Sequence, residues 1–63
     1  MKIVKYSKYF KDFVQYLVID DNNIIVAVLH YDTITKQVFK IRFIDDAPAT
    51  IKKVLEASKH VDI

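Results

Sequence analysis

The sequence predicts a small α+β domain in which a three-stranded antiparallel sheet is packed by one C-terminal helix. Two observations lead to this prediction. Between residues 13 and 44, runs rich in β-branched and aromatic residues alternate with short polar turns, which is typical of strands. After that, apolar residues recur at the spacing of an amphipathic helix. A chain of 63 residues has room for a single domain, residues 1–63.

The first two strands are predicted at about 13–19 and 24–31 as a β-hairpin. Both runs are rich in Val, Ile, Leu and Tyr, and the polar sequence Asp20-Asp21-Asn22-Asn23 joins them. The chain contains no glycine. A turn residue with positive φ must therefore be Asn or Asp, which tolerate that conformation better than other side chains.

The third strand is predicted at about 37–44, where apolar and basic residues alternate. The alternating residues are Phe39, Lys40, Ile41, Arg42 and Phe43. Successive side chains of a strand point to opposite faces of the sheet. We therefore expect the three apolar residues to face the core and the two basic residues to face solvent.

A helix is predicted at about 47–59. It follows Asp45-Asp46-Ala47-Pro48, where a carboxylate can cap the first amides and proline is tolerated in the first turn. Ile51, Val54 and Leu55 follow at helical spacing and are expected to be buried.

The N-terminal segment is open between a helix and an extra strand, particularly over residues 5–14. Aromatic residues gather on one side of a helical wheel and lysines on the other, which favours a helix. Lysines at a helix N-terminus oppose the helix dipole, and neither glycine nor proline separates this segment from the first strand, which favours a strand.

The composition argues against an enzyme, a metal site and a bound cofactor. The chain has no cysteine, and its two histidines, His30 and His60, are too far apart in sequence for a zinc motif. Without glycine there is no glycine-rich phosphate loop. The pairs Asp20-Asp21 and Asp45-Asp46 are expected to serve as a turn and a helix cap. We therefore predict no catalytic residues.

The sequence also predicts a cytoplasmic protein that does not enter a membrane. The longest unbroken apolar run, Ile24 to Leu29, is far shorter than the roughly 18 residues that suggest a membrane span. The first residues lack the apolar stretch of a secretory signal. The formal net charge is only +2, so charge alone does not identify a partner.

A binding surface is predicted on the sheet face that the helix leaves exposed. If a four-residue turn joins the last two strands, Leu29 and Tyr31 lie beside Lys40 and Arg42 on that face. Apolar and basic groups together suit a DNA groove or a nucleotide base. The alternative is that the two basic residues simply form a solvated strand face.

The last hairpin resembles that of the small sheet-and-barrel chromatin proteins of crenarchaea. The resemblance lies in an Asp-x-x-Thr turn at Asp32, a Phe-basic-x-basic strand from Phe39, and Asp45-Asp46-Ala47-Pro48 before a helix. It implies binding of duplex DNA through a sheet laid on the minor groove. By position, Leu29, Lys40 and Arg42 would match sheet-face contacts. Three strands followed by one helix are also similar to the arm-binding domains of tyrosine-type integrases.

The family pattern is incomplete in this chain. Gln15 falls near the position of the family's sheet tryptophan, and Asp20-Asp21-Asn22-Asn23 replaces a basic, glycine-rich loop.

Two hypotheses for function follow. The first is a non-catalytic module that binds double-stranded DNA through Leu29, Tyr31, Lys40 and Arg42. The second is a protein-interaction module, such as a small inhibitor or adaptor of a virus or mobile element, which uses the same face or the tyrosine-rich N-terminal segment. A homodimer is a third arrangement, because a domain this small gains stability from association.

Overall fold

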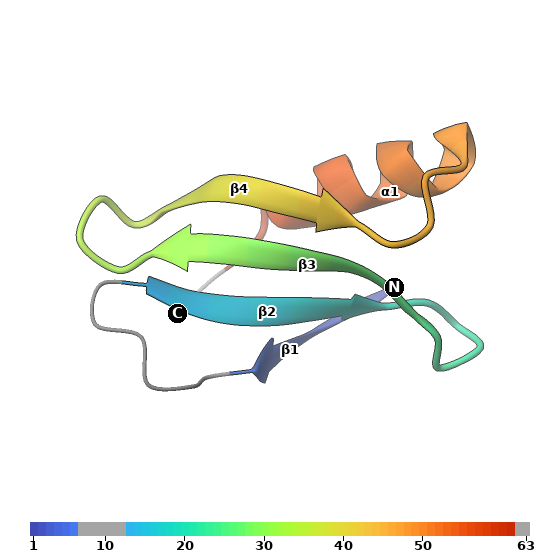
Figure 1. Cartoon of the computed structure of the whole chain (residues 1–63), viewed down its shortest axis with the longest axis horizontal. Coiled ribbons are helices and arrows are strands. Elements are labelled where there is room, and N and C mark those ends of the chain that lie inside the picture. The colour runs from blue at the N-terminus through green and yellow to red at the C-terminus, as the bar shows by residue number, and fades with distance from the viewer. Residues whose placement is uncertain (7–12, 62–63) are drawn as a thin grey trace.

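The protein is a four-stranded antiparallel sheet followed by a single helix. A computed structural model describes residues 1–6 and 13–61. The elements are β1 (Lys2–Tyr6), β2 (Phe13–Ile19), β3 (Ile25–Asp32), β4 (Gln37–Phe43) and α1 (Pro48–Ser58). The strands follow one another across the sheet in chain order, and α1 crosses one face (Figure 1). The predicted α+β class and the C-terminal helix are confirmed, but the sheet has four strands and not three.

The fourth strand is β1, at the edge of the sheet beside β2. Ile3 is paired with Val18 and Lys5 with Tyr16 in antiparallel register. Of the two alternatives for residues 5–14, the helix is therefore wrong for residues 5, 6, 13 and 14, which belong to β1 and β2, while residues 7–12 lie outside the described part of the chain. The strand is favoured because it supplies hydrogen-bond partners to β2, which would otherwise be the sheet edge.

The hairpin turns are held by aspartate side chains. Oδ1 of Asp20 accepts hydrogen bonds from the backbone N–H groups of Asn22 (2.8 Å) and Ile24 (3.0 Å). Asn23 has a φ of 63°, as expected for a glycine-free turn. The turn between β3 and β4 also uses a positive φ, 61°, but there the residue is Lys36. Nothing in the sequence marks Lys36 for this conformation.

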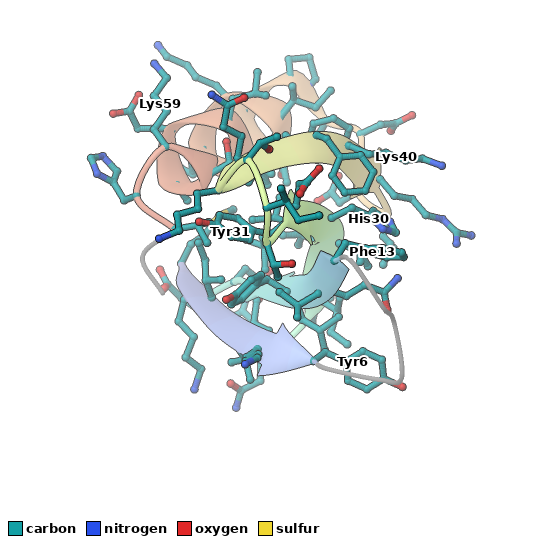
Figure 2. The ribbon with its side chains drawn as sticks, turned by 90° about the vertical axis from the view of Figure 1, so that its left-hand side faces the viewer. Tyr6, Phe13, His30, Tyr31, Lys40 and Lys59 are labelled. Carbon is teal, nitrogen blue, oxygen red and sulfur yellow. The ribbon has the colours of Figure 1, made fainter. Side chains whose placement is uncertain are left out.

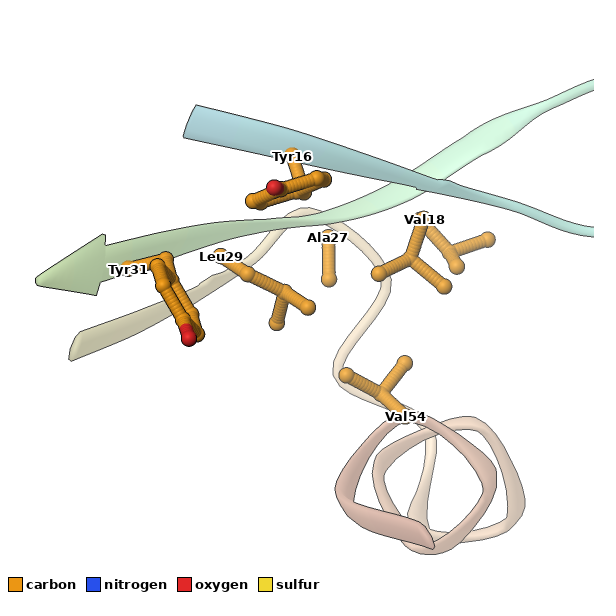
Figure 3. Close-up of a cluster of buried hydrophobic side chains, with 7 residues drawn as sticks. Tyr16, Val18, Ala27, Leu29, Tyr31 and Val54 are labelled. Carbon is orange, nitrogen blue, oxygen red and sulfur yellow. The ribbon is translucent and has the colours of Figure 1, made fainter. Parts of the chain in front are cut away.

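The core lies between the sheet and α1 (Figure 3). Its fully or almost fully buried side chains are Tyr16, Val18, Val26, Ala27, Leu29, Tyr31 and Val54. The rings of Tyr16 and Tyr31 meet edge to face, with their centroids 6.0 Å apart. Partly buried apolar residues from β1, β2 and β4 surround this cluster, so every strand contributes to one core.

The helix contacts the sheet through a narrow stripe. Val54 is completely buried and Ile51 is half-buried, but Leu55 is 45% exposed, so the prediction that Leu55 is buried is wrong. Leu55 lies about 100° around the helix from Val54, and a single helix on a small sheet buries little more than one row of side chains. The predicted carboxylate cap is wrong, because the N-cap residue is Ala47 and no side chain of the described residues caps the first helix amides. Asp45 instead stabilises the turn before the helix, where it accepts hydrogen bonds from the Ala47 N–H (3.0 Å) and the Thr50 hydroxyl (3.1 Å).

Candidate functional site

The two faces of the sheet differ in their surroundings. We call the face toward α1 the covered face, and it carries the core residues. The opposite side we call the open face, since no other element of residues 1–6 and 13–61 lies over it (Figure 2). The strand registers assign the following side chains to the open face: Val4, Tyr6, Phe13, Gln15, Leu17, Val28, His30, Lys40 and Arg42. Phe39 has no partner in the register, and its ring contacts with Phe13 and His30 place it on the same face.

Leu29 and Tyr31 are not on the open face, so their predicted exposure is wrong. Leu29 is 0% exposed and Tyr31 7%, and both belong to the core. Lys40 and Arg42 are exposed and point away from the core, as predicted. The structure thus separates the four predicted site residues into two groups on opposite sides of the sheet.

The cause is a register shift in β4. Tyr31 is paired with Val38, and the next pair is His30 with Lys40, so Phe39 is an extra residue. Without this bulge Lys40 would lie opposite Leu29. An inserted residue reverses the faces of all positions beyond it. Phe39, which the alternation with Ile41 and Phe43 predicted on the core face, follows the core-facing Val38 and therefore lies on the open face. The bulge then places Lys40 on the same face as Phe39.

Three aromatic side chains meet on the open face, and we call them the ring cluster: Phe13, His30 and Phe39. The centroids of the Phe13 and Phe39 rings are 5.7 Å apart, in an edge-to-face arrangement. The His30 ring is 5.8 Å from Phe13 and 6.0 Å from Phe39. Figure 2 shows Phe13, His30 and Lys40 on the opposite side of the sheet from Tyr31.

The electrostatics of the cluster are set by two cations. Lys40 is paired with His30 across the strands, and Arg42 is paired with Val28. Partial burial lowers the pKa of His30 below its ordinary value, and the charges of Lys40 and Arg42 lower it further. At neutral pH the imidazole is therefore uncharged and behaves as a third aromatic ring beside two fixed positive charges.

A shallow hollow lies on the other side of the sheet, near the end of α1. Its volume is about 360 Å³. The residues around it are Tyr31, Lys36, Gln37, Val38, Ser58, Lys59 and Val61. The amine of Lys59 is already 3.8 Å from the Glu56 carboxylate, and the Ser58 hydroxyl donates to the Leu55 carbonyl at 2.8 Å. These polar groups are thus engaged within the helix and do not converge on the hollow.

The described residues offer little for metal binding or acid–base chemistry. No three metal-ligating side chains are grouped among them. His30 lies among phenyl rings, while His60 faces Glu56 at 3.8 Å at the exposed end of α1. No helix of the described residues has the length and apolar character needed to cross a membrane.

Sequence reasoning missed Phe13, His30 and Phe39 as one group. The alternation of β3 could have revealed His30, because it follows Leu29 and must face the other way if Leu29 is buried. Phe39 could not be found in this manner, because the bulge that puts it out of phase with Ile41 and Phe43 has no glycine or proline to mark it.

No protein-family model, no curated protein and no solved structure matches the chain. The resemblance to crenarchaeal chromatin proteins therefore stays a prediction, and the arguments for function rest on the geometry of the open face.

Proposed function

We propose that the chain is a non-catalytic module that binds nucleic acid on its open face. The observation that carries the proposal is the presence of Lys40 and Arg42 beside a partly exposed cluster of aromatic rings. Basic side chains bind phosphates, and flat apolar surface between them accommodates sugars and bases.

The two cations are available for phosphates. Both side chains are exposed, and no carboxylate of the described residues forms an ion pair with either of them. They lie two residues apart on β4 and on the same face, so they project about 7 Å from each other along the strand. Each phosphate that they neutralise would release a condensed counterion and make the affinity depend on salt.

The acidic turns lie away from the ring cluster. Asp20 and Asp21 are in the β2–β3 turn, and Asp45 and Asp46 follow β4. Both connections are at the same end of the sheet, because the backbone N–H of Asp45 donates to the carbonyl of Val26 next to the start of β3. The β3–β4 turn and the start of β2, where Phe13 is paired with Asp32, are at the opposite end (Figure 1). A polyanion bound at the ring cluster would therefore lie away from these four carboxylates and would not be repelled by them at close range.

The test is a salt titration of two matched double variants. Lys40→Ala with Arg42→Ala should reduce the slope of log affinity against log salt by up to about 2, roughly one unit per lost phosphate contact. Lys52→Ala with Lys53→Ala removes the same charge from exposed positions on α1 and should leave the slope nearly unchanged. Both should keep the free energy of unfolding within roughly 0.5 kcal/mol.

Two results would refute the proposal. One is the absence of binding to any nucleic acid at about 50 mM salt, where phosphate attraction is weakly screened. The other is an equal loss of slope in both double variants, which would mean that binding depends on net charge and not on the open face.

A protein partner is the second candidate, favoured by apolar groups on the same face. Val4 is 39% and Tyr6 42% exposed on the edge strand β1. A second copy of the chain could cover such a surface, since small domains gain stability from association. Sedimentation over a range of concentrations would then show a dimer whose affinity is insensitive to salt and is lost on Val4→Asp.

A further inference from the structure

Phe39 is a large apolar side chain that the sheet leaves exposed on its open face. Its side chain is 56% exposed, although its neighbours Val38 and Ile41 pack against the core. Val38 faces the core opposite Tyr31, so Phe39 after it points outward. Its ring loses the burial that alternation with Ile41 and Phe43 would give it, and the bulge that follows keeps Lys40 from returning to the core face. Lys40, the next residue, projects from the same face. The bulge thus places a phenyl ring and a cation side by side on the open face.

We infer that the ring cluster stacks on unpaired bases, so that the open face binds single-stranded nucleic acid in preference to the duplex. The inference rests on the proposed function and specifies its ligand. In a duplex the flat faces of the bases are hidden in the helical stack, whereas a single strand can turn them toward an aromatic ring. Phenyl rings have no hydrogen-bonding atoms with which to recognise base edges, so Phe13 and Phe39 are suited to stacking.

The charges around the cluster fit a strand whose bases lie on the rings. Lys40 and Arg42 follow Phe39 along β4, so the sugar-phosphate backbone can run beside this strand while the bases turn toward β2 and β3. Among the described residues, the carboxylate of Asp32 is nearby, because Asp32 lies opposite Phe13. Its Oδ1 accepts hydrogen bonds from the Ile34 and Thr35 backbone amides (2.8 and 3.1 Å), which partly neutralise it.

The experiment compares three probes of equal length, about 12 nucleotides, within the range that one small sheet domain occupies. They are a single-stranded oligonucleotide, its duplex, and an abasic deoxyribose-phosphate chain with the same number of phosphates. We expect the single strand to bind most tightly at one fixed salt concentration. The abasic chain keeps the charge but offers nothing to stack, so it measures the phosphate contribution alone.

Variants at Phe39 then test the ring itself. Phe39→Ala should weaken binding of the single strand by roughly 5- to 150-fold, the loss expected for one stacked base, and should leave the abasic chain unaffected. Phe39→Trp should retain binding, and Phe39→Leu should not, because leucine preserves apolar contact without an aromatic face. Leu55→Ala, which removes an exposed apolar group from α1, is the control and should change nothing.

Each failure has a different meaning. Tighter binding of the duplex, equal binding of the single strand and the abasic chain, or full affinity of the Phe39→Leu variant would overturn the stacking inference and leave nucleic-acid binding standing. If none of the three probes binds at about 50 mM salt, the proposed function falls together with the inference.

Discussion

The two faces of one sheet carry different chemistry in this protein. On the covered face, Leu29 and Val18 are completely buried beneath α1. On the open face, their strand neighbours His30 and Leu17 are only half-buried, and Lys40 and Arg42 are exposed. The two faces alternate residue by residue along each strand. Of two neighbouring residues, one therefore packs in the core and the other lies on the open face.

This difference suggests that the covered face provides most of the stability and that the open face is available for binding. A domain of this size has one thin core, and its stability is expected to depend on a few side chains of the covered face. The open face contributes less burial and can carry charge and exposed rings at little cost to the fold. Variants of paired residues on the two faces can test this division.

The largest effect is expected from a matched pair of leucines. Leu29→Ala removes a completely buried side chain and should lower the free energy of unfolding by roughly 2 to 5 kcal/mol. Leu17→Ala, on the neighbouring strand but on the open face, should cost about 1 kcal/mol, because less surface leaves contact. Urea unfolding measures both. Equal losses would contradict the division between the faces.

A smaller effect is expected where α1 meets the sheet. Val54→Ala should destabilise by about 1 to 2 kcal/mol, from two lost methyl groups and the space they leave. Leu55→Ala should cost under about 1 kcal/mol, since the residue is already 45% exposed and alanine is the better helix former. Thermal unfolding monitored by circular dichroism compares them. A larger loss of stability for Leu55→Ala than for Val54→Ala would mean that Leu55, and not Val54, packs against the sheet.

The smallest effect concerns pH. The pKa of His30 is lowered in the folded protein, so between that value and the ordinary value of about 6.5 the unfolded chain binds more protons. Stability should therefore fall as the pH falls through this window and level off below the folded pKa. His30→Gln should remove this part of the pH dependence, whereas His60→Gln should retain it. An unchanged profile in the His30 variant would show that neither burial nor the cations lower the pKa of this ring in the folded protein.

The sequence predicted the local features of this fold well. The three later strands and the helix are close to their expected ranges, because alternating and helical apolar patterns are local properties of the chain. The turn at Asp20–Asn23 also follows from local chemistry, since a glycine-free chain requires Asn or Asp at positive φ. The alternation of side chains along a strand likewise indicated that Lys40 and Arg42 point away from the core.

What the sequence could not decide is which residues share a face across strands. That depends on register, and the single extra residue at Phe39 reverses the expected partners of Lys40 and Arg42. The predicted site therefore included Leu29 and Tyr31, which are in the core, and omitted Phe13, His30 and Phe39.

By itself, then, the sequence determined the strands from β2 onward, the helix and the direction of the basic residues on β4. The tertiary structure decided the rest: β1 as the fourth strand, the exposure of Leu55, and the ring cluster. These features arise from pairing and packing between distant segments. A bulge and the placement of one helix are settled by the total burial and hydrogen bonding of the sheet, and no local pattern encodes that sum.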